Sequence, residues 1–182
     1  KAQGDRIFDL LLRTGYSPKR LEILRELFST GAIETSRIDR LTWSPWREVL
    51  TPLQVTDLLK VLLQQGATIS SLISFTEAYL HTHSAALDDL REIGIQLLRR
   101  GQETDRNERT MHGYHWEQLA KRLVKENPYE IAQAVLDELA RRKSSIQHGL
   151  AEVLQTAWKL TDQRKLFREV IGPWLEIETS EA

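Results

Sequence analysis

The chain has 182 residues, 41% of them hydrophobic, and its 25 Lys and Arg residues nearly balance 26 Asp and Glu residues, for a net charge of −1. This balance argues against a surface that is basic throughout and binds nucleic acid along its length. The absence of cysteine excludes disulfides, thiolate zinc sites, iron–sulfur clusters and cysteine nucleophiles. No apolar run approaches the ~20 residues that cross a bilayer, so we expect a soluble, cytoplasmic protein with no membrane partner.

Helical periodicity runs through almost the whole chain, which contains 28 Leu but only 7 Val. The clearest apolar stripe has the spacing i, i+3, i+4, i+7, i+8 of one helix face. It consists of Trp116, Leu119, Ala120, Leu123 and Val124. No stretch shows the clean alternation of a strand bounded by turns. The sequence therefore predicts an all-α fold of about 9–11 helices.

Prolines and glycines predict where these helices begin and end. Four of the five prolines follow a Ser, Thr or Asn that can cap a first helical turn. They are Pro18, Pro45, Pro52 and Pro128. Four glycines follow apolar runs and are predicted to end helices in the left-handed conformation. They are Gly31, Gly66, Gly101 and Gly172. The predicted helices cover 5–14, 18–30, 35–42, 45–50, 52–65, 69–82, 85–100, 115–126, 128–142, 145–160 and 162–171.

Residues 101–114 interrupt this pattern, because they include five charged residues and almost nothing apolar. A loop of this length inside a compact domain is uncommon. Mixed charges and small polar residues are typical of a tip that does not pack on a core. We therefore expect a mobile polar loop over 101–114.

Three of the helices that start at a proline share more than their cap. In each, an apolar residue follows the proline by three positions (Leu21, Val55 and Ile131), and the starts lie 34 and 76 residues apart. Known helical repeats have periods of about 34 to 47 residues. Over residues 17–171 the sequence resembles HEAT or armadillo-type α-solenoid repeats. The resemblance implies stacked antiparallel helical hairpins; a compact multi-helix domain is the alternative.

The length of the chain suits a single domain of this kind. The chain begins at Lys1, and its only methionine is Met111. We therefore expect residues 1–182 to form one all-α domain that is part of a larger protein.

Sequence motifs for cofactors and metals are not found. The chain has no phosphate-binding loop, dinucleotide fingerprint, zincin helix or nucleophile elbow. His81 and His83 with His112 and His115 would form a metal site from two loops, but no carboxylate or cysteine stands beside them at a ligand spacing. We favour histidines at helix ends or in loops, and we expect no bound metal and no cofactor.

Several arginines precede a histidine at a similar interval. Arg109 and His115 have five residues between them, as do Arg142 and His148. This spacing is similar to that in all-α HEPN-type ribonucleases, in which a histidine follows an arginine after four to six residues. The resemblance implies an acid/base histidine and an arginine that stabilises phosphate charge. The competing interpretation is that Arg141 and Arg142 compensate a helix C-terminus, and we expect the chain not to be an enzyme.

The preferred function is a non-catalytic scaffold module that presents a rigid helical surface to a protein partner or to other domains of the parent chain. Its charges of mixed sign suit a protein better than a phosphate backbone, which takes clustered cations. A nucleic-acid-binding helical domain is therefore a further alternative. Trp43 and Trp46 bracket a turn and are either interface anchors or plugs between helix pairs. The predicted partner-binding residues are Arg20, Arg25, Lys60, Glu130, Arg141, Arg142, Trp43 and Trp46.

Overall fold

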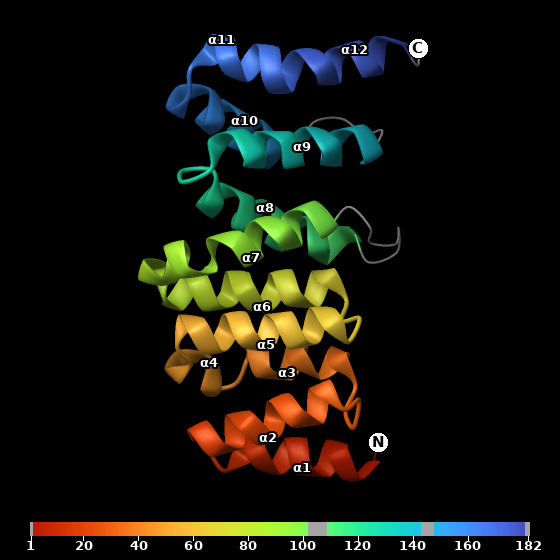
Figure 1. Ribbon diagram of the computed structural model, residues 1–182, viewed down its shortest axis with the longest axis vertical. Coiled ribbons are helices and arrows are strands. Elements are labelled where there is room, and N and C mark those ends of the chain that lie inside the picture. The colour runs from red at the N-terminus through yellow and green to blue at the C-terminus, as the bar shows by residue number, and fades with distance from the viewer. Residues whose placement is uncertain (1, 102–108, 143–147, 181–182) are drawn as a thin grey trace. The chain divides into compact units, whose positions relative to one another are not determined.

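The computed structural model describes residues 2–101, 109–142 and 148–180. All regular elements in these ranges are helices, which confirms the predicted all-α fold (Figure 1). The α-helices are α1 (Ala2–Arg13), α2 (Pro18–Ser29), α3 (Ile38–Thr42), α4 (Trp46–Val49), α5 (Pro52–Gln64), α6 (Ile69–Thr82), α7 (Leu87–Arg100), α8 (Arg109–Leu123), α9 (Pro128–Arg142), α10 (His148–Leu160), α11 (Gln163–Leu166) and α12 (Gly172–Ser180). Short 3₁₀ turns, η1 (Thr35–Arg37) and η2 (Ser84–Ala86), precede α3 and α7, and a π-helical segment, Phe167–Ile171, precedes α12.

The chain divides into two compact units, which we call unit 1 (Lys1–Ile93) and unit 2 (Gly94–Ala182). Each unit has its own set of fully buried side chains, with Phe28 and Leu58 in unit 1 and Trp116 and Val135 in unit 2. A single domain over 1–182 and the stacking of HEAT-like hairpins remain predictions.

Helices α2 and α5 begin and end in the same way. Pro18 and Pro52 are their first residues, and the hydroxyl oxygen of the preceding residue accepts a backbone N–H in each case. The Thr51 hydroxyl accepts from the Gln54 N–H at 3.3 Å, and the Gln54 side chain accepts from the Thr51 N–H at 3.0 Å, which completes a capping box. In both, the residue after the C-cap is a glycine of positive φ, Gly31 (66°) and Gly66 (73°). Local signals in the sequence therefore set both ends of these two helices.

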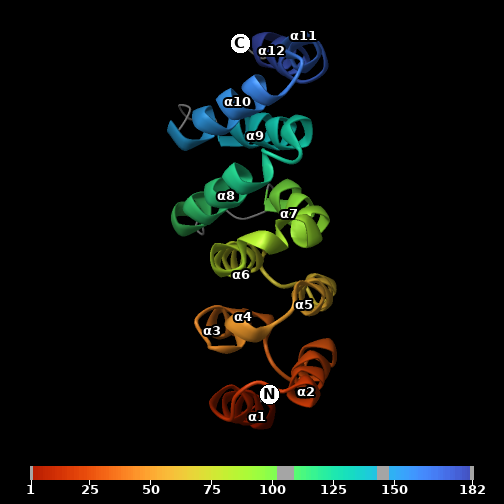
Figure 2. The ribbon, with the colours of Figure 1, turned by 90° about the vertical axis from the view of Figure 1, so that its left-hand side faces the viewer.

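Unit 1 is built from helices that pack in two rows. Helix α1 packs on α2, α2 packs on α5, and α3 packs on α6. Figure 2 shows α1, α3 and α6 on one side of this unit and α2 and α5 on the other. Ion pairs hold α1 to the η1–α3 segment: Arg37 Nε lies 3.0 Å from Asp5 Oδ1, and Arg40 pairs with Asp9. The Arg40 guanidinium also lies 5.8 Å from the centre of the Phe8 ring.

Tyr79 of α6 fixes the short connection between α4 and α5. Its hydroxyl donates to the Leu50 carbonyl oxygen at 2.8 Å, and both groups are buried. The His83 ring stacks on Tyr79 with ring centres 4.4 Å apart, and its Nε2 lies 3.1 Å from the Glu48 carbonyl oxygen. Burial raises the pKa of the Tyr79 phenol, and the negative charge of Asp89 raises it further.

We expect Tyr79→Phe to lower the free energy of unfolding by about 1–2 kcal/mol, because the Leu50 carbonyl would stay buried without its donor. Urea denaturation followed by circular dichroism measures this loss. Tyr114→Phe is the matched control, since Tyr114 is 62% exposed. Equal stability of the two variants would contradict the role given to the Tyr79 hydroxyl.

In unit 2, α9 packs against both α8 and α10. All five residues of the predicted stripe are buried, four of them on α8 and Val124 directly after it. The Trp116 indole N–H donates to the Leu98 carbonyl oxygen at 3.1 Å. Lys121 joins α8 to α10, because its Nζ lies 2.7 Å from Glu152 and 3.0 Å from Glu117. Hydrogen bonds to Glu152 and then to Glu117 raise the pKa of Lys121.

Two predicted boundaries are wrong. Helix α8 starts at Arg109, so 109–114 is helical and not part of a loop, while 102–108 lies outside the described residues. Of the glycines that the structure describes, Gly15, Gly31 and Gly66 have positive φ, whereas Gly172 has a φ of −58°, so the predicted left-handed end at Gly172 is also wrong. The chain stays helical through Gly172 because the wider π-helical turn before it suits a proline, Pro173, that has no N–H to donate.

Candidate interaction surface

The predicted partner-binding residues belong to both units. Five of them, Arg20, Arg25, Trp43, Trp46 and Lys60, lie in unit 1, and Glu130, Arg141 and Arg142 lie in unit 2. The backbone of Arg141 and Arg142 ends α9, but their side chains lie outside the described residues. The described part of the set therefore has most of its members in unit 1.

The two arginines of α2 bind other parts of unit 1. Arg20 Nη1 donates to the carbonyl oxygens of Thr14 (2.6 Å) and Gly15 (3.0 Å), which follow the end of α1. Arg25 Nη1 lies 3.7 Å from Asp57 Oδ2, which links α2 to α5. The Arg25 and Asp57 side chains are 38% and 37% exposed, so this pair contributes only about 0–1 kcal/mol to stability. Both guanidiniums serve the fold, and neither is the strongest candidate for a partner contact.

Lys60 and Glu130 have side chains that are exposed to solvent. Lys60 is exposed on α5. In unit 2, Glu130 Oε2 lies 3.8 Å from Arg99 Nη2, and the two side chains are 50% and 56% exposed. A charge pair at this exposure is weakly held and can rearrange around a bound partner.

Trp46 lies in the core, which corrects its assignment as a partner-binding residue. It is 1% exposed, and the Tyr16 ring meets it edge to face at 5.7 Å between ring centres. The Tyr16 hydroxyl is in turn hydrogen-bonded to the Gln54 side chain. Trp46 therefore fills the space between the α1–α2 connection and the start of α5. Of the two interpretations of this residue, the structure supports a plug between helices over an interface anchor.

Trp43 lies on the surface and is 78% exposed. The turn that carries it is fixed by hydrogen bonds on both sides. The Ser44 N–H and hydroxyl both donate to the Leu41 carbonyl oxygen, at 3.1 and 3.0 Å. Arg47 Nη1 donates to the Thr42 carbonyl oxygen at 2.9 Å. The indole thus projects from a rigid turn into solvent.

Two further apolar side chains are exposed on the same stretch of chain, residues 43–53, which we call the Trp43 segment. Val49 is 52% exposed and Leu53 is 71% exposed. Single exposed aliphatic residues are common on soluble proteins. The Trp43 segment thus carries three exposed apolar side chains within eleven residues, one of them a tryptophan.

The residues predicted for metal binding or RNA cleavage do not assemble into a site that the structure describes. His83 stacks on Tyr79, and both its ring nitrogens face backbone carbonyl oxygens. The side chains of Arg109, His112, Arg142 and His148 lie outside the described residues. Among the side chains that the structure describes, no group of three or more His, Cys, Asp or Glu residues is placed to hold a metal ion.

Comparison with protein-family models, curated proteins and solved structures finds no match for the chain. Of the helices that the structure describes, none is both long enough and apolar enough to cross a membrane. Among the predicted partner-binding residues, Trp43 is 78% exposed and is held on a turn fixed by hydrogen bonds.

Proposed function

We propose that unit 1 is a non-catalytic protein-binding module whose contact with a protein partner is centred on Trp43. The observation that carries this proposal is an indole 78% exposed on a turn fixed by hydrogen bonds. Tryptophan is enriched among the residues that dominate binding energy in protein interfaces. An aromatic side chain of this size buries about 150–250 Å² when a partner covers it.

The rigidity of the Trp43 turn supports an anchoring role. Ordering a flexible side chain or loop on binding costs about 0.5–1.5 kcal/mol for each side chain immobilised. The hydrogen bonds from Ser44 to the Leu41 carbonyl oxygen and from Arg47 to the Thr42 carbonyl oxygen already hold this turn before a partner binds. A partner would therefore meet a preformed apolar anchor.

The packing of unit 1 supports a helical-repeat scaffold as the frame for this anchor. Helices α2 and α5 share a proline start and a glycine end, and they pack on each other. Helices α3 and α6 likewise pack on each other on the other side of the unit (Figure 2). In repeat proteins each helix pair contacts its neighbours, and loops and surface residues at one edge carry the specificity.

The test compares wild-type protein and Trp43→Ala as baits in lysate of the producing organism. Any captured protein is purified, and its affinity is measured by isothermal titration calorimetry. We expect Trp43→Ala to weaken binding by about 2 kcal/mol or more, close to thirtyfold, with unchanged circular dichroism. Leu10→Ala is the matched control, because Leu10 is 61% exposed but lies on α1. A partner that binds wild type and Trp43→Ala equally tightly would contradict the proposal.

A further inference from the structure

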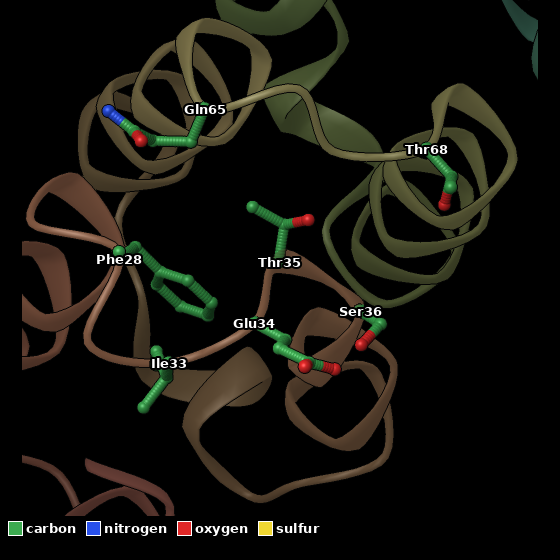
Figure 3. A pocket seen from close by; sticks show the side chains of 8 residues that line it. Phe28, Ile33, Glu34, Thr35, Ser36, Gln65 and Thr68 are labelled. Carbon is green, nitrogen blue, oxygen red and sulfur yellow. The ribbon is translucent and has the colours of Figure 1, made fainter. Parts of the chain in front are cut away.

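A pocket of about 350 Å³ opens at the edge of unit 1, where α2 and α5 end and where η1 and α6 begin (Figure 3). The charged residue that lines it, Glu34, already has an interaction within the chain. Figure 3 shows the Gln65 amide directed away from the pocket. The side chains around this pocket therefore indicate no class of ligand, and we place none there.

In unit 2, exposed basic and apolar side chains gather where α10 ends and α11 begins. We call this group the Arg164 surface, and it consists of Lys159, Leu160, Arg164, Lys165, Phe167 and Arg168. Leu160 and Phe167 are 52% and 50% exposed, and the Arg168 side chain is 77% exposed. Leu166 and Val170 of the same stretch are buried, so one side of it is anchored in the core while the other faces solvent.

The turn that carries the Arg164 surface is held by its own hydrogen bonds. The Thr161 hydroxyl donates to the Ala157 carbonyl oxygen at 2.8 Å. Asp162 Oδ1 accepts from the backbone N–H groups of Arg164 and Lys165, at 2.9 and 3.2 Å. The backbone beneath the exposed side chains is therefore fixed before a partner binds, which lowers the entropy lost on binding.

The Arg164 surface is positively charged. Residues 159–169 contain four basic and two acidic residues, a net charge of +2, whereas the whole chain has −1. Both acidic residues have partners within the stretch: Asp162 caps α11, and Glu169 lies 3.2 Å from Arg168 Nη2 and 3.9 Å from Lys165 Nζ. Lys159 and Arg164 form no ion pair with the residues that the structure describes. These two cations are therefore available to carboxylates of a partner.

The apolar side chains of the Arg164 surface favour a protein partner over a nucleic acid. Single-stranded nucleic acids are bound by several aromatic rings on which successive bases stack, whereas this surface combines one aromatic ring, Phe167, with the aliphatic Leu160. Arginine and aromatic residues are enriched in protein interfaces, and a guanidinium can bind a carboxylate through two parallel hydrogen bonds. The complementary partner therefore has carboxylates next to apolar side chains.

We infer that the Arg164 surface binds an acidic segment of a protein partner that also carries apolar side chains. Lys159 and Arg164 pair with its carboxylates, and its apolar side chains cover Leu160 and Phe167. The inference goes beyond the proposed function, because the Arg164 surface belongs to unit 2 and the Trp43 segment belongs to unit 1. The two contacts can therefore be tested separately.

The experiment titrates the full chain, labelled with ¹⁵N, with the acetylated and amidated peptide EELFEELLEE and follows backbone amide shifts by NMR. The peptide EESSEESSEE keeps the charge without the apolar side chains, and a short oligouridine tests the nucleic-acid alternative. The double variant Lys159→Gln, Arg164→Gln removes the two available cations. Arg6→Gln, Arg13→Gln is the matched control, because it removes the same charge from exposed residues of α1 in unit 1. Circular dichroism establishes that both double variants keep the helical fold.

We expect EELFEELLEE to cause saturable shifts at residues 159–170 and to bind more tightly than EESSEESSEE. The variant Lys159→Gln, Arg164→Gln should bind it about threefold or more weakly, as expected for the loss of two exposed ion pairs, while the α1 variant should bind as wild type does. Shifts that do not saturate, equal affinity of the two peptides, equal affinity of Lys159→Gln, Arg164→Gln and wild type, or tighter binding of the oligouridine would each overturn the inference. None of these outcomes alters the Trp43→Ala test, so failure here leaves the proposed function standing.

Discussion

Trp46→Ala is expected to lower the free energy of unfolding by about 3–5 kcal/mol, the cost of truncating a fully buried large aromatic side chain. The indole is 1% exposed and contacts the Tyr16 ring, so its removal leaves a cavity between the α1–α2 connection and α5. Urea denaturation followed by circular dichroism measures the loss. Because the chain has two compact units, hydrogen exchange of residues 8–62 should show that the loss is located in unit 1.

Two variants provide the controls for this prediction. The Trp46 indole nitrogen is buried and has no hydrogen-bond partner in the described part of the chain. Trp46→Phe removes that unpaired N–H while keeping an aromatic ring, so we expect a change within about 1.5 kcal/mol. Trp43→Ala removes a side chain that is 78% exposed, and we expect a change within about 0.5 kcal/mol. A larger loss for Trp43→Ala than for Trp46→Ala would contradict the assignment of the two residues.

The features that the sequence predicted correctly depend on neighbours in the chain. A hydroxyl residue before a proline caps a helix through atoms no more than three residues apart, and this is what Ser17 and Thr51 do. The buried stripe on α8 follows from helical periodicity in the same way, because one face of a helix must meet the core. Such features need no knowledge of which helices become neighbours.

The candidate site was only partly predictable, because burial and pairing depend on distant residues. Trp43 and Trp46 stand three residues apart in a turn between short helices, where periodicity gives no clear inner face. The Trp43 indole is exposed and the Trp46 indole is buried. Trp46 packs against the ring of Tyr16, which lies thirty positions earlier in the sequence. Arg25 likewise has its partner, Asp57, on another helix. The pocket near Glu34 had no sequence signal either, because it arises where two helices end side by side.

Gly4 is a further residue whose role appears only in the packed structure. Within a helix, glycine is about 1 kcal/mol less favourable than alanine, so the sequence offers no reason for it in α1. In the structure Gly4 is buried, and a Cβ added there would overlap the Ala32 carbonyl oxygen and lie 2.9 Å from its carbonyl carbon. The glycine allows α1 to approach the chain that follows α2.

Gly4→Ala is therefore expected to lower the free energy of unfolding by about 1–3 kcal/mol, although alanine is the better helix former. The clash is with backbone, which cannot rotate away, so α1 must shift and weaken its contacts with α2 and with the η1–α3 segment.

Gly94→Ala in α7 is the matched control, because the nearest atom to its Cβ would be Leu123 Cδ1 at 2.9 Å, the end of a flexible side chain. There the gain in helix propensity should dominate, so stability should be unchanged or higher by up to about 1 kcal/mol. Urea denaturation of both variants under the same conditions gives the comparison. A Gly4→Ala variant as stable as Gly94→Ala would show that the close approach of α1 does not constrain residue 4.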